Sequence, residues 1–349
     1  MNRIYLLDIA RGIAALAVAI FHYQLFYSYN ISLNAYNIEI QPFYNIIKII
    51  YNHGWIAVQF FFLLSGFIFF KLYLQIVNER RISFYKFIIL RISRLYPLHL
   101  LSLLLVFIIF LILKFNNFYN PIYVDFKHLL LNLLLIHEWG FKSNASFNEP
   151  SWSISIEFLM YLIFFLIALN KNIFLNTFIL ITFSSIIFFK FKLIGYGGFC
   201  FFIGGLSYLL NERIKMKENY KILYLIISIL LFTSFLKIND LSSEIEKIIL
   251  LAFIFPALIN CLFLINKKLP HVGKKLSILG DISYSIYLLH FPVILITLLI
   301  LNFFNLKADF NLPFIFISYL TITIIISIFV YKFFETPLKN KIRIKFLKK

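Results

Sequence analysis

Apolar runs of about 18–22 residues, the length that crosses a bilayer, follow one another along almost the whole chain. Short polar segments separate them. The pattern predicts membrane-spanning helices at 6–27, 53–72, 97–114, 152–169, 173–189, 195–210, 221–236, 248–265, 280–302 and 313–334. The expected fold is therefore an all-α polytopic membrane protein with ten spans.

One apolar segment is too short to span. The run HLLLNLLLIHEWG covers only residues 128–140, whereas a crossing needs about 20 residues. Counting it as a span would also place the basic segment 211–221 outside and the segment 237–247 inside, against the positive-inside rule. We expect a short re-entrant or interfacial helix on the outer side.

Composition agrees with a membrane protein. The 349 residues are 62% hydrophobic, with mean hydropathy +0.90, more apolar surface than a soluble domain of this size can bury. Because the chain has no long polar stretch, we expect one membrane-embedded domain over 1–349 and no appended soluble domain. Cys200 and Cys261 lie in apolar runs and are interpreted as core residues, with no metal site expected.

The net charge of +18 is unevenly placed. With the N-terminus inside, and with each lysine at the end of a span counted with the adjoining segment, the cytoplasmic segments hold 22 Lys and Arg and the opposite loops hold 9. Arg11 and Lys332 lie within spans. Excess positive charge marks cytoplasmic loops. The distribution therefore predicts that both termini are cytoplasmic, and it explains the basic character without a nucleic acid partner.

Arg11 and His22 lie within the first predicted span. Eleven residues bring both side chains to one helix face, about 16 Å apart along the axis. An arginine in the hydrocarbon core costs at least about 2.5–3.5 kcal/mol, which indicates a function. The alternative interpretation is a snorkelling arginine and a hydrogen-bonded core histidine.

A second pair of arginines precedes the third predicted span. Arg91 and Arg94 are three residues apart, so on a helix they share a face and can bind one phosphate together. Positive-inside charge alone also accounts for such residues. We expect Pro97 to end or kink the segment where the span begins.

The segment PSWSISIEFLMYL (150–162) places Glu157 inside the fourth span, near its outer end. His22 lies at a similar predicted depth. A histidine beside a carboxylate in a region of low dielectric constant can take a proton from a hydroxyl group. The alternative is a structural hydrogen bond between packed helices. Asp281 and Glu335 are expected to cap helix ends or pair with basic loop residues.

Six segments in order resemble the membrane acyltransferase family 3, which includes O-acetyltransferases of O-antigen and peptidoglycan. They are LDIARGIAALAVAIFHY (7–23), GWIAVQFFFLLSGFIFF (54–70), RISRLYP (91–97), PSWSISIEFLMYL (150–162), GDISYSIYLLHFPV (280–293) and FFETPLK (333–339). The resemblance implies transfer of an acetyl group from acetyl-CoA, as co-substrate and without a bound cofactor, to a sugar hydroxyl or amine. The acceptor is expected to be an extracytoplasmic glycan, and the location the bacterial cytoplasmic (inner) membrane.

The resemblance also implies roles for individual residues. His22 would be catalytic, with Glu157 as its partner or as the alternative base. Arg11, Arg91 and Arg94 would bind the acyl donor. The residues expected to line the substrate channel are Asp8, Ser153, Tyr284, Tyr287 and His290.

Several alternatives remain open from the sequence. Transfer can be direct or can pass through a transient acyl-enzyme. Some relatives carry an extracytoplasmic hydrolase-like domain, which is not expected here, so a separate partner could finish the transfer. A flippase for lipid-linked sugars would also have many spans and buried charges, although no internal duplication is evident. A structural subunit is the third interpretation.

Overall fold

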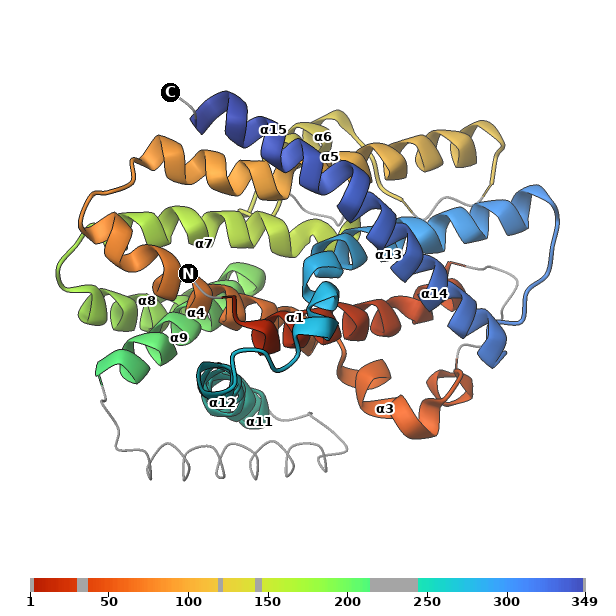
Figure 1. The fold of residues 1–349 in the computed structure, drawn as a ribbon. Coiled ribbons are helices and arrows are strands. Elements are labelled where there is room, and N and C mark those ends of the chain that lie inside the picture. The colour runs from red at the N-terminus through yellow and green to blue at the C-terminus, as the bar shows by residue number, and fades with distance from the viewer. Residues whose placement is uncertain (1–2, 30–36, 119–121, 142–145, 214–243, 348–349) are drawn as a thin grey trace. The chain divides into compact units, whose positions relative to one another are not determined.

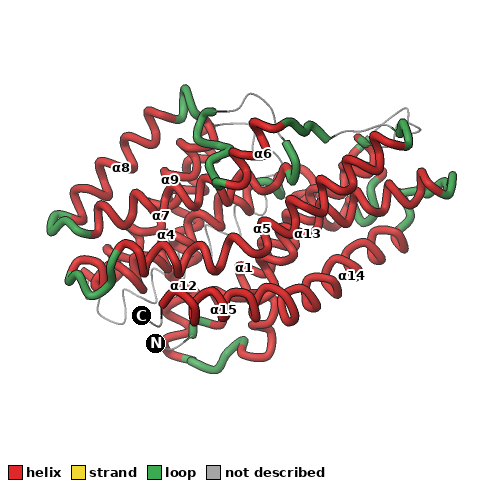
Figure 2. Tube along the Cα trace, turned by 90° about the horizontal axis from the view of Figure 1, so that it is seen from above, coloured by secondary structure: helices red, strands yellow, loops and turns green. Residues whose placement is uncertain are grey.

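The computed structural model describes residues 3–29, 37–118, 122–141, 146–213 and 244–347. Helices joined by loops and turns account for these residues, and no strand occurs among them, as Figures 1 and 2 show. The main helices are α1 (Tyr5–Phe21), α2 (Leu25–Ser28), α3 (Tyr44–His53), α4 (Ile56–Asn78), α5 (Phe84–Phe115), α6 (Phe126–Leu133), α7 (Trp152–Ala168), α8 (Ile173–Ile187), α9 (Lys192–Arg213), α11 (Glu244–Ile249), α12 (Phe255–Lys268), α13 (Ile278–Phe303), α14 (Pro313–Val330) and α15 (Thr336–Leu347).

Within the described residues, eight helical segments are long and apolar enough to cross a membrane. They are Tyr5–Ser28, Ile56–Asn78, Phe84–Phe115, Glu149–Ala168, Lys192–Glu212, Glu246–Lys268, Lys274–Phe303 and Pro313–Leu347. The predicted polytopic helical fold is confirmed. Of the other two predicted spans, 173–189 corresponds to the shorter helix α8, and 221–236 lies outside the described residues. The count of ten remains a prediction.

The third span begins earlier than predicted. Helix α5 starts at Phe84 and continues through Pro97 to Phe115. Proline lacks the N–H that would bond the carbonyl of Ser93, which costs roughly 3 kcal/mol in a helix interior. Breaking the helix there would leave more backbone groups unpaired in hydrocarbon, a larger penalty. The segment therefore does not end at Pro97, and a kink at this residue remains a prediction.

The short apolar segment forms the eight-residue helix α6, and the prediction of a helix over 128–140 overestimated its extent. The carboxylate of Asp125 caps its start by accepting from the backbone N–H of His128 at 2.7 Å. Leu135 has φ 59°, so the chain leaves the helical conformation and continues in turns. The placement of α6 at the membrane surface remains a prediction.

The chain divides into two compact units. Unit 1 comprises 1–14, 56–84 and 156–281, and unit 2 comprises 15–55, 85–155 and 282–349. The single domain over 1–349 expected from the sequence remains a prediction.

In unit 1, α4 packs closely on α9. A Cβ atom on Gly66 would lie 1.8 Å from the carbonyl oxygen of Phe201, and one on Gly204 would lie 2.0 Å from that of Leu63. Only glycine fits at either position. Small residues that let two backbones meet are typical of packing between membrane helices, and this contact fixes the position of α4 in unit 1.

An aromatic cluster forms part of the core of unit 2. Tyr23 and Phe26 from the first span pack with Phe310, Phe316 and Tyr319. The hydroxyl of Tyr23 donates to the Phe310 carbonyl at 2.8 Å, so burial leaves this polar group satisfied. Tyr23 follows His22 directly in the chain, so the packing of this cluster also fixes the backbone at His22.

Candidate active site

His22 and His290 are in contact within unit 2. His22 begins the short 3₁₀ turn that follows α1, and His290 lies inside α13. Nδ1 of His22 lies 3.1 Å from Nε2 of His290, and the two ring planes are 26° apart. His290 is fully buried, whereas His22 is partly exposed. The sequence placed both residues in the candidate site but did not predict this contact.

The backbone carbonyl oxygens next to the two rings indicate which nitrogen of each ring carries the hydrogen. Nδ1 of His290 lies 3.2 Å from the Ile286 carbonyl, and Nδ1 of His22 lies 3.0 Å from that of Val18. Because carbonyl oxygens only accept, we assign a hydrogen to both Nδ1 atoms. Nε2 of His290 then accepts from His22. Nε2 of His22 carries a lone pair and has no hydrogen-bond partner in the described part of the chain.

Tyr287 joins the helix of His290 to the start of α7. Its hydroxyl donates to the Pro150 carbonyl at 2.7 Å and lies 2.7 Å from Oγ of Ser153, which therefore donates to it. The Tyr287 ring also contacts His290, with centroids 6.1 Å apart. Three of the residues expected to line the channel, Ser153, Tyr287 and His290, are thus neighbours in unit 2.

Arg91 and Arg94 lie in the first half of α5, also in unit 2. Arg91 is buried, and its guanidinium lies 5.6 Å from the centre of the Phe87 ring one helical turn earlier. Arg94 is partly exposed. The hydroxyl of Tyr284 donates to the carbonyl of Leu95 at 2.7 Å, which ties α13 to α5 next to Arg94.

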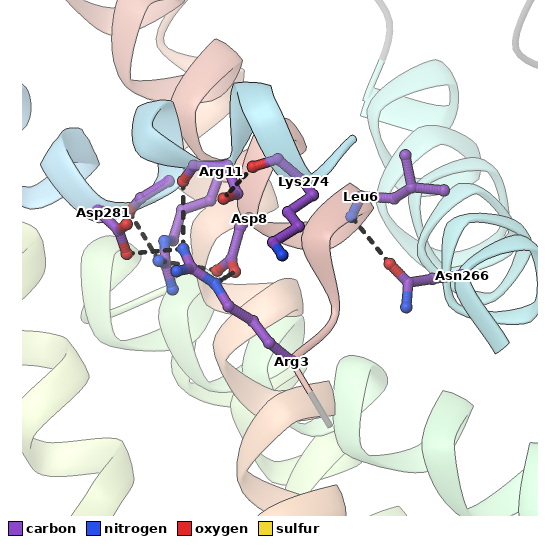
Figure 3. A network of polar contacts seen from close by, with 9 residues as sticks. Arg3, Leu6, Asp8, Arg11, Asn266, Lys274 and Asp281 are labelled. Atoms are coloured by element: carbon purple, nitrogen blue, oxygen red, sulfur yellow. Dashed lines mark hydrogen bonds and ion pairs between the residues drawn. The ribbon is translucent and has the colours of Figure 1, made fainter. Parts of the chain in front are cut away.

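Arg11 lies in a cluster of alternating charges in unit 1 (Figure 3). It donates to Asp8 at 3.0 Å and to the carbonyl of Gly280 at 2.7 Å. Arg3 bridges Asp8 and Asp281, at 2.6 Å from each. Two guanidiniums and two carboxylates balance, which lowers the cost of placing Arg11 in a span. The expectation that Asp281 pairs with a basic residue is confirmed.

Close packing supports this cluster. A Cβ atom on Gly280 would lie 2.4 Å from the carbonyl oxygen of Asp8, and one on Gly12 would lie 2.5 Å from Cβ of Leu279. The first turns of α1 and α13 therefore meet backbone to backbone. The Arg-Gly pair in the sequence has a physical reason, because Gly12 lets Leu279 and Gly280 approach Arg11.

Glu157 lies in unit 1, with partners that the sequence did not predict. Oε1 of Glu157 accepts from the hydroxyl of Ser65 at 2.7 Å and from that of Tyr161. Since His22 belongs to unit 2, the expected contact between His22 and Glu157 remains a prediction.

Further polar residues are buried in unit 2. His99 and His137 have ring planes 7° apart and centroids 5.8 Å apart. Nε2 of His99 lies 2.9 Å from the Asn132 carbonyl, and Nε2 of His137 lies 3.2 Å from that of Ser151. The amide of Asn148 donates to the Leu288 carbonyl at 3.0 Å. The signal in the sequence was His99 itself, an ionisable residue within a predicted span.

Glu335 has a partner that the sequence did not predict. It lies in a π-helical turn (Tyr331–Glu335) between α14 and α15, where it is buried and accepts from the hydroxyl of Ser285 at 2.8 Å. The expectation that it caps a helix end or pairs with a basic loop residue remains a prediction. The two cysteines are buried and free, as expected of core residues. No group of His, Cys, Asp and Glu suited to a metal ion occurs among the residues that the structure describes.

Comparison with protein families gives one match. The acyltransferase domain that defines acyltransferase family 3 matches residues 4–332. A comparison with curated proteins finds no match, and neither does one with solved structures. The matched region contains both histidines of the contact and the arginines at 11, 91 and 94. The chain belongs to acyltransferase family 3 and is a membrane acyltransferase.

Proposed function

We propose that this membrane acyltransferase moves an acetyl group from acetyl-CoA to a hydroxyl group of an extracytoplasmic glycan. The acceptor is O-antigen, capsule or another surface polysaccharide, and the enzyme resides in the bacterial cytoplasmic membrane with both termini inside. One observation carries the mechanism, the partly exposed His22 whose Nδ1 is 3.1 Å from Nε2 of His290. This arrangement leaves Nε2 of His22 available as a base.

His22 acts in this proposal as a general base. Its Nε2 takes the proton of the acceptor hydroxyl while the oxygen attacks the thioester carbonyl carbon. The carbon–sulfur bond then breaks, and the leaving thiolate takes the proton back from the imidazolium. The products are the O-acetyl ester and CoA. The imidazolium is stabilised because its Nδ1–H donates to His290, in the role that a carboxylate has in other base–orienter pairs.

The arginines bind the acyl donor in this proposal. Arg91 and Arg94 share one face of α5, where two guanidiniums can hold the phosphates of the CoA nucleotide. Arg11, in unit 1, is also proposed to bind the donor, and its contacts with Asp8 and Gly280 fix its orientation. In this proposal the arginines bind the donor through their positive charge, and the histidine pair transfers the proton.

The family match supports acyl transfer over the export of lipid-linked sugars. The test is to incubate vesicles containing the purified protein with [¹⁴C-acetyl]CoA and the lipid-linked glycan fraction of the host. We expect label in the glycan, released by mild base as an ester would be. A protein that changes the amount of glycan on the far side of the membrane without labelling it would contradict the proposal.

A further inference from the structure

Ser65, Glu157 and Tyr161 form a polar group inside unit 1. Ser65 comes from α4, and the other two lie one turn apart on α7. The two hydroxyls donate to the same carboxylate oxygen, Oε1, and lie 3.3 Å from each other. The proposed proton transfer at His22 uses none of these groups.

The second oxygen of Glu157 is open to a ligand. Oε2 accepts no hydrogen bond from the residues that the structure describes, and Glu157 forms no ion pair among them. Glu157 and Ser65 are both partly exposed. A carboxylate in a span is costly, and where one persists it commonly serves binding or transport. Here one oxygen is held by hydroxyls and the other can accept.

The frame around this group is rigid. The Tyr161 ring stacks on Phe69 with centroids 4.0 Å apart and planes 12° apart. Phe201 contacts both rings from α9. Gly66, next to Ser65, meets the backbone of Phe201 so closely that no side chain fits. Both hydroxyls are therefore fixed in position, and they in turn hold the carboxylate in one orientation.

We propose that Oε2 of Glu157 binds a hydroxyl group of the acceptor glycan, with Ser65 and Tyr161 as positioning residues. This inference rests on the proposed function and names a contact for its acceptor. A carboxylate only accepts hydrogen bonds, so it selects groups that donate. Sugar hydroxyls donate, whereas the phosphates of acetyl-CoA are anions that Glu157 repels. Of the two substrates, Glu157 therefore suits the acceptor.

The test measures glycan and donor binding separately. The purified protein in lipid nanodiscs is mixed with the radiolabelled lipid-linked glycan fraction of the host, and retention on a filter gives the Kd. Acetyl-CoA binding and the KM for each substrate are measured on the same variants. The variants are Glu157→Gln, Tyr161→Phe and Ser65→Ala. Glutamine and phenylalanine keep the shape of the replaced side chains, so thermal unfolding should stay close to that of the wild type.

Glu157→Gln loses one charge-assisted hydrogen bond to the glycan, so we expect its glycan Kd to rise by about tenfold or more. Tyr161→Phe and Ser65→Ala each lose one positioning hydroxyl, so we expect the glycan Kd of either variant to rise by roughly threefold to tenfold. The Kd for acetyl-CoA should not change. Matched controls are Tyr85→Phe and Ser185→Ala, since both residues are exposed and Ser185, among the described residues, bonds to the Ile181 carbonyl of its own helix.

The outcomes separate this inference from the proposed function. Glycan retention by the wild type without acetyl transfer would contradict the proposed function and leave the Glu157 contact standing. Normal retention and transfer by Glu157→Gln would overturn the contact and leave the proposed function intact. A larger effect on acetyl-CoA binding than on glycan binding, or a wild type that does not retain the glycan, would also overturn it.

Discussion

Nδ1 of His22 lies 3.1 Å from Nε2 of His290, although 268 residues separate them in the chain. His290 also fixes the tautomer of His22, because its own Nδ1–H is directed at the Ile286 carbonyl. Nε2 is then the basic nitrogen of His22, a residue that is partly exposed. The partner of the base is a neutral ring and not a carboxylate. Between reactions the pair therefore carries no charge in the span and needs no counter-ion.

Replacement of His290 by phenylalanine should slow acetyl transfer by about tenfold to a hundredfold, less than the roughly hundredfold to ten-thousandfold that the positioned base itself contributes. The reason is that the Nδ1–H of His22 then keeps only the Val18 carbonyl as acceptor, so the imidazolium that forms during transfer is less stabilised and less firmly oriented. Acetyl-CoA binding should be unchanged. The measurement is single-turnover transfer beside donor binding. An unchanged rate would show that His290 has no part in orienting His22.

Arg94→Ala should raise the KM for acetyl-CoA by roughly tenfold, the effect of losing one charge-assisted contact. Lysine at this position should restore only part of the affinity, because a point charge cannot reproduce the guanidinium fork. Arg94 suits this test better than the buried Arg91, whose loss also removes packing on Phe87. Arg81→Ala, in the exposed loop before α5, is the control. Equal effects of both variants would argue for a nonspecific role of surface charge.

The stability of α6 should depend on pH through Asp125. The backbone N–H of His128 donates to its carboxylate and holds the pKa of Asp125 below the ordinary value of 3.8. A group whose pKa is lowered in the folded state stabilises that state above the ordinary value and loses this contribution as pH falls through the native value. Hydrogen exchange in 126–133 should therefore become less protected below about pH 4. Asp125→Asn should remove most of this pH dependence.

Cysteine labelling tests the predicted orientation. With both termini cytoplasmic, the loop 266–275 faces inward and 115–150 faces outward. Single cysteines at His271 and Asn116, which are both exposed, should react with an impermeant thiol reagent from opposite sides. The native cysteines are buried, so they should give little background. Reaction of both positions from the same side would contradict the assignment. The predicted loops 211–221 and 237–247 lie largely outside the described residues.

Hydropathy predicted the helical fold well, because a span leaves a signal summed over about 20 residues. It could not place the helix start at Phe84. The residues before Pro97 include Lys86, Arg91 and Arg94, so their charge suggests a loop, and only their continuity with α5 reveals that they belong to the same helix. Hydropathy also could not predict where α6 ends, because its end depends on the left-handed conformation of Leu135.

The candidate site was predictable residue by residue but not contact by contact. His22 and Glu157 stood out because ionisable groups in spans are rare. Their contacts did not, since Ser65 meets Glu157, and His290 meets His22, only through helix packing within each unit. Arg3 was missed for a related reason, because its bond to Asp281 joins segments 278 residues apart in the chain.

The central claim is that His22 moves the proton, and His22→Ala tests it most directly. The variant, reconstituted in vesicles, is given [¹⁴C-acetyl]CoA and the host glycan fraction with and without added imidazole, beside His271→Ala as a surface control. We predict that His22→Ala transfers at least about a hundredfold more slowly than the wild type, binds acetyl-CoA normally and is partly restored by imidazole. Full transfer activity in the His22→Ala variant would contradict this account.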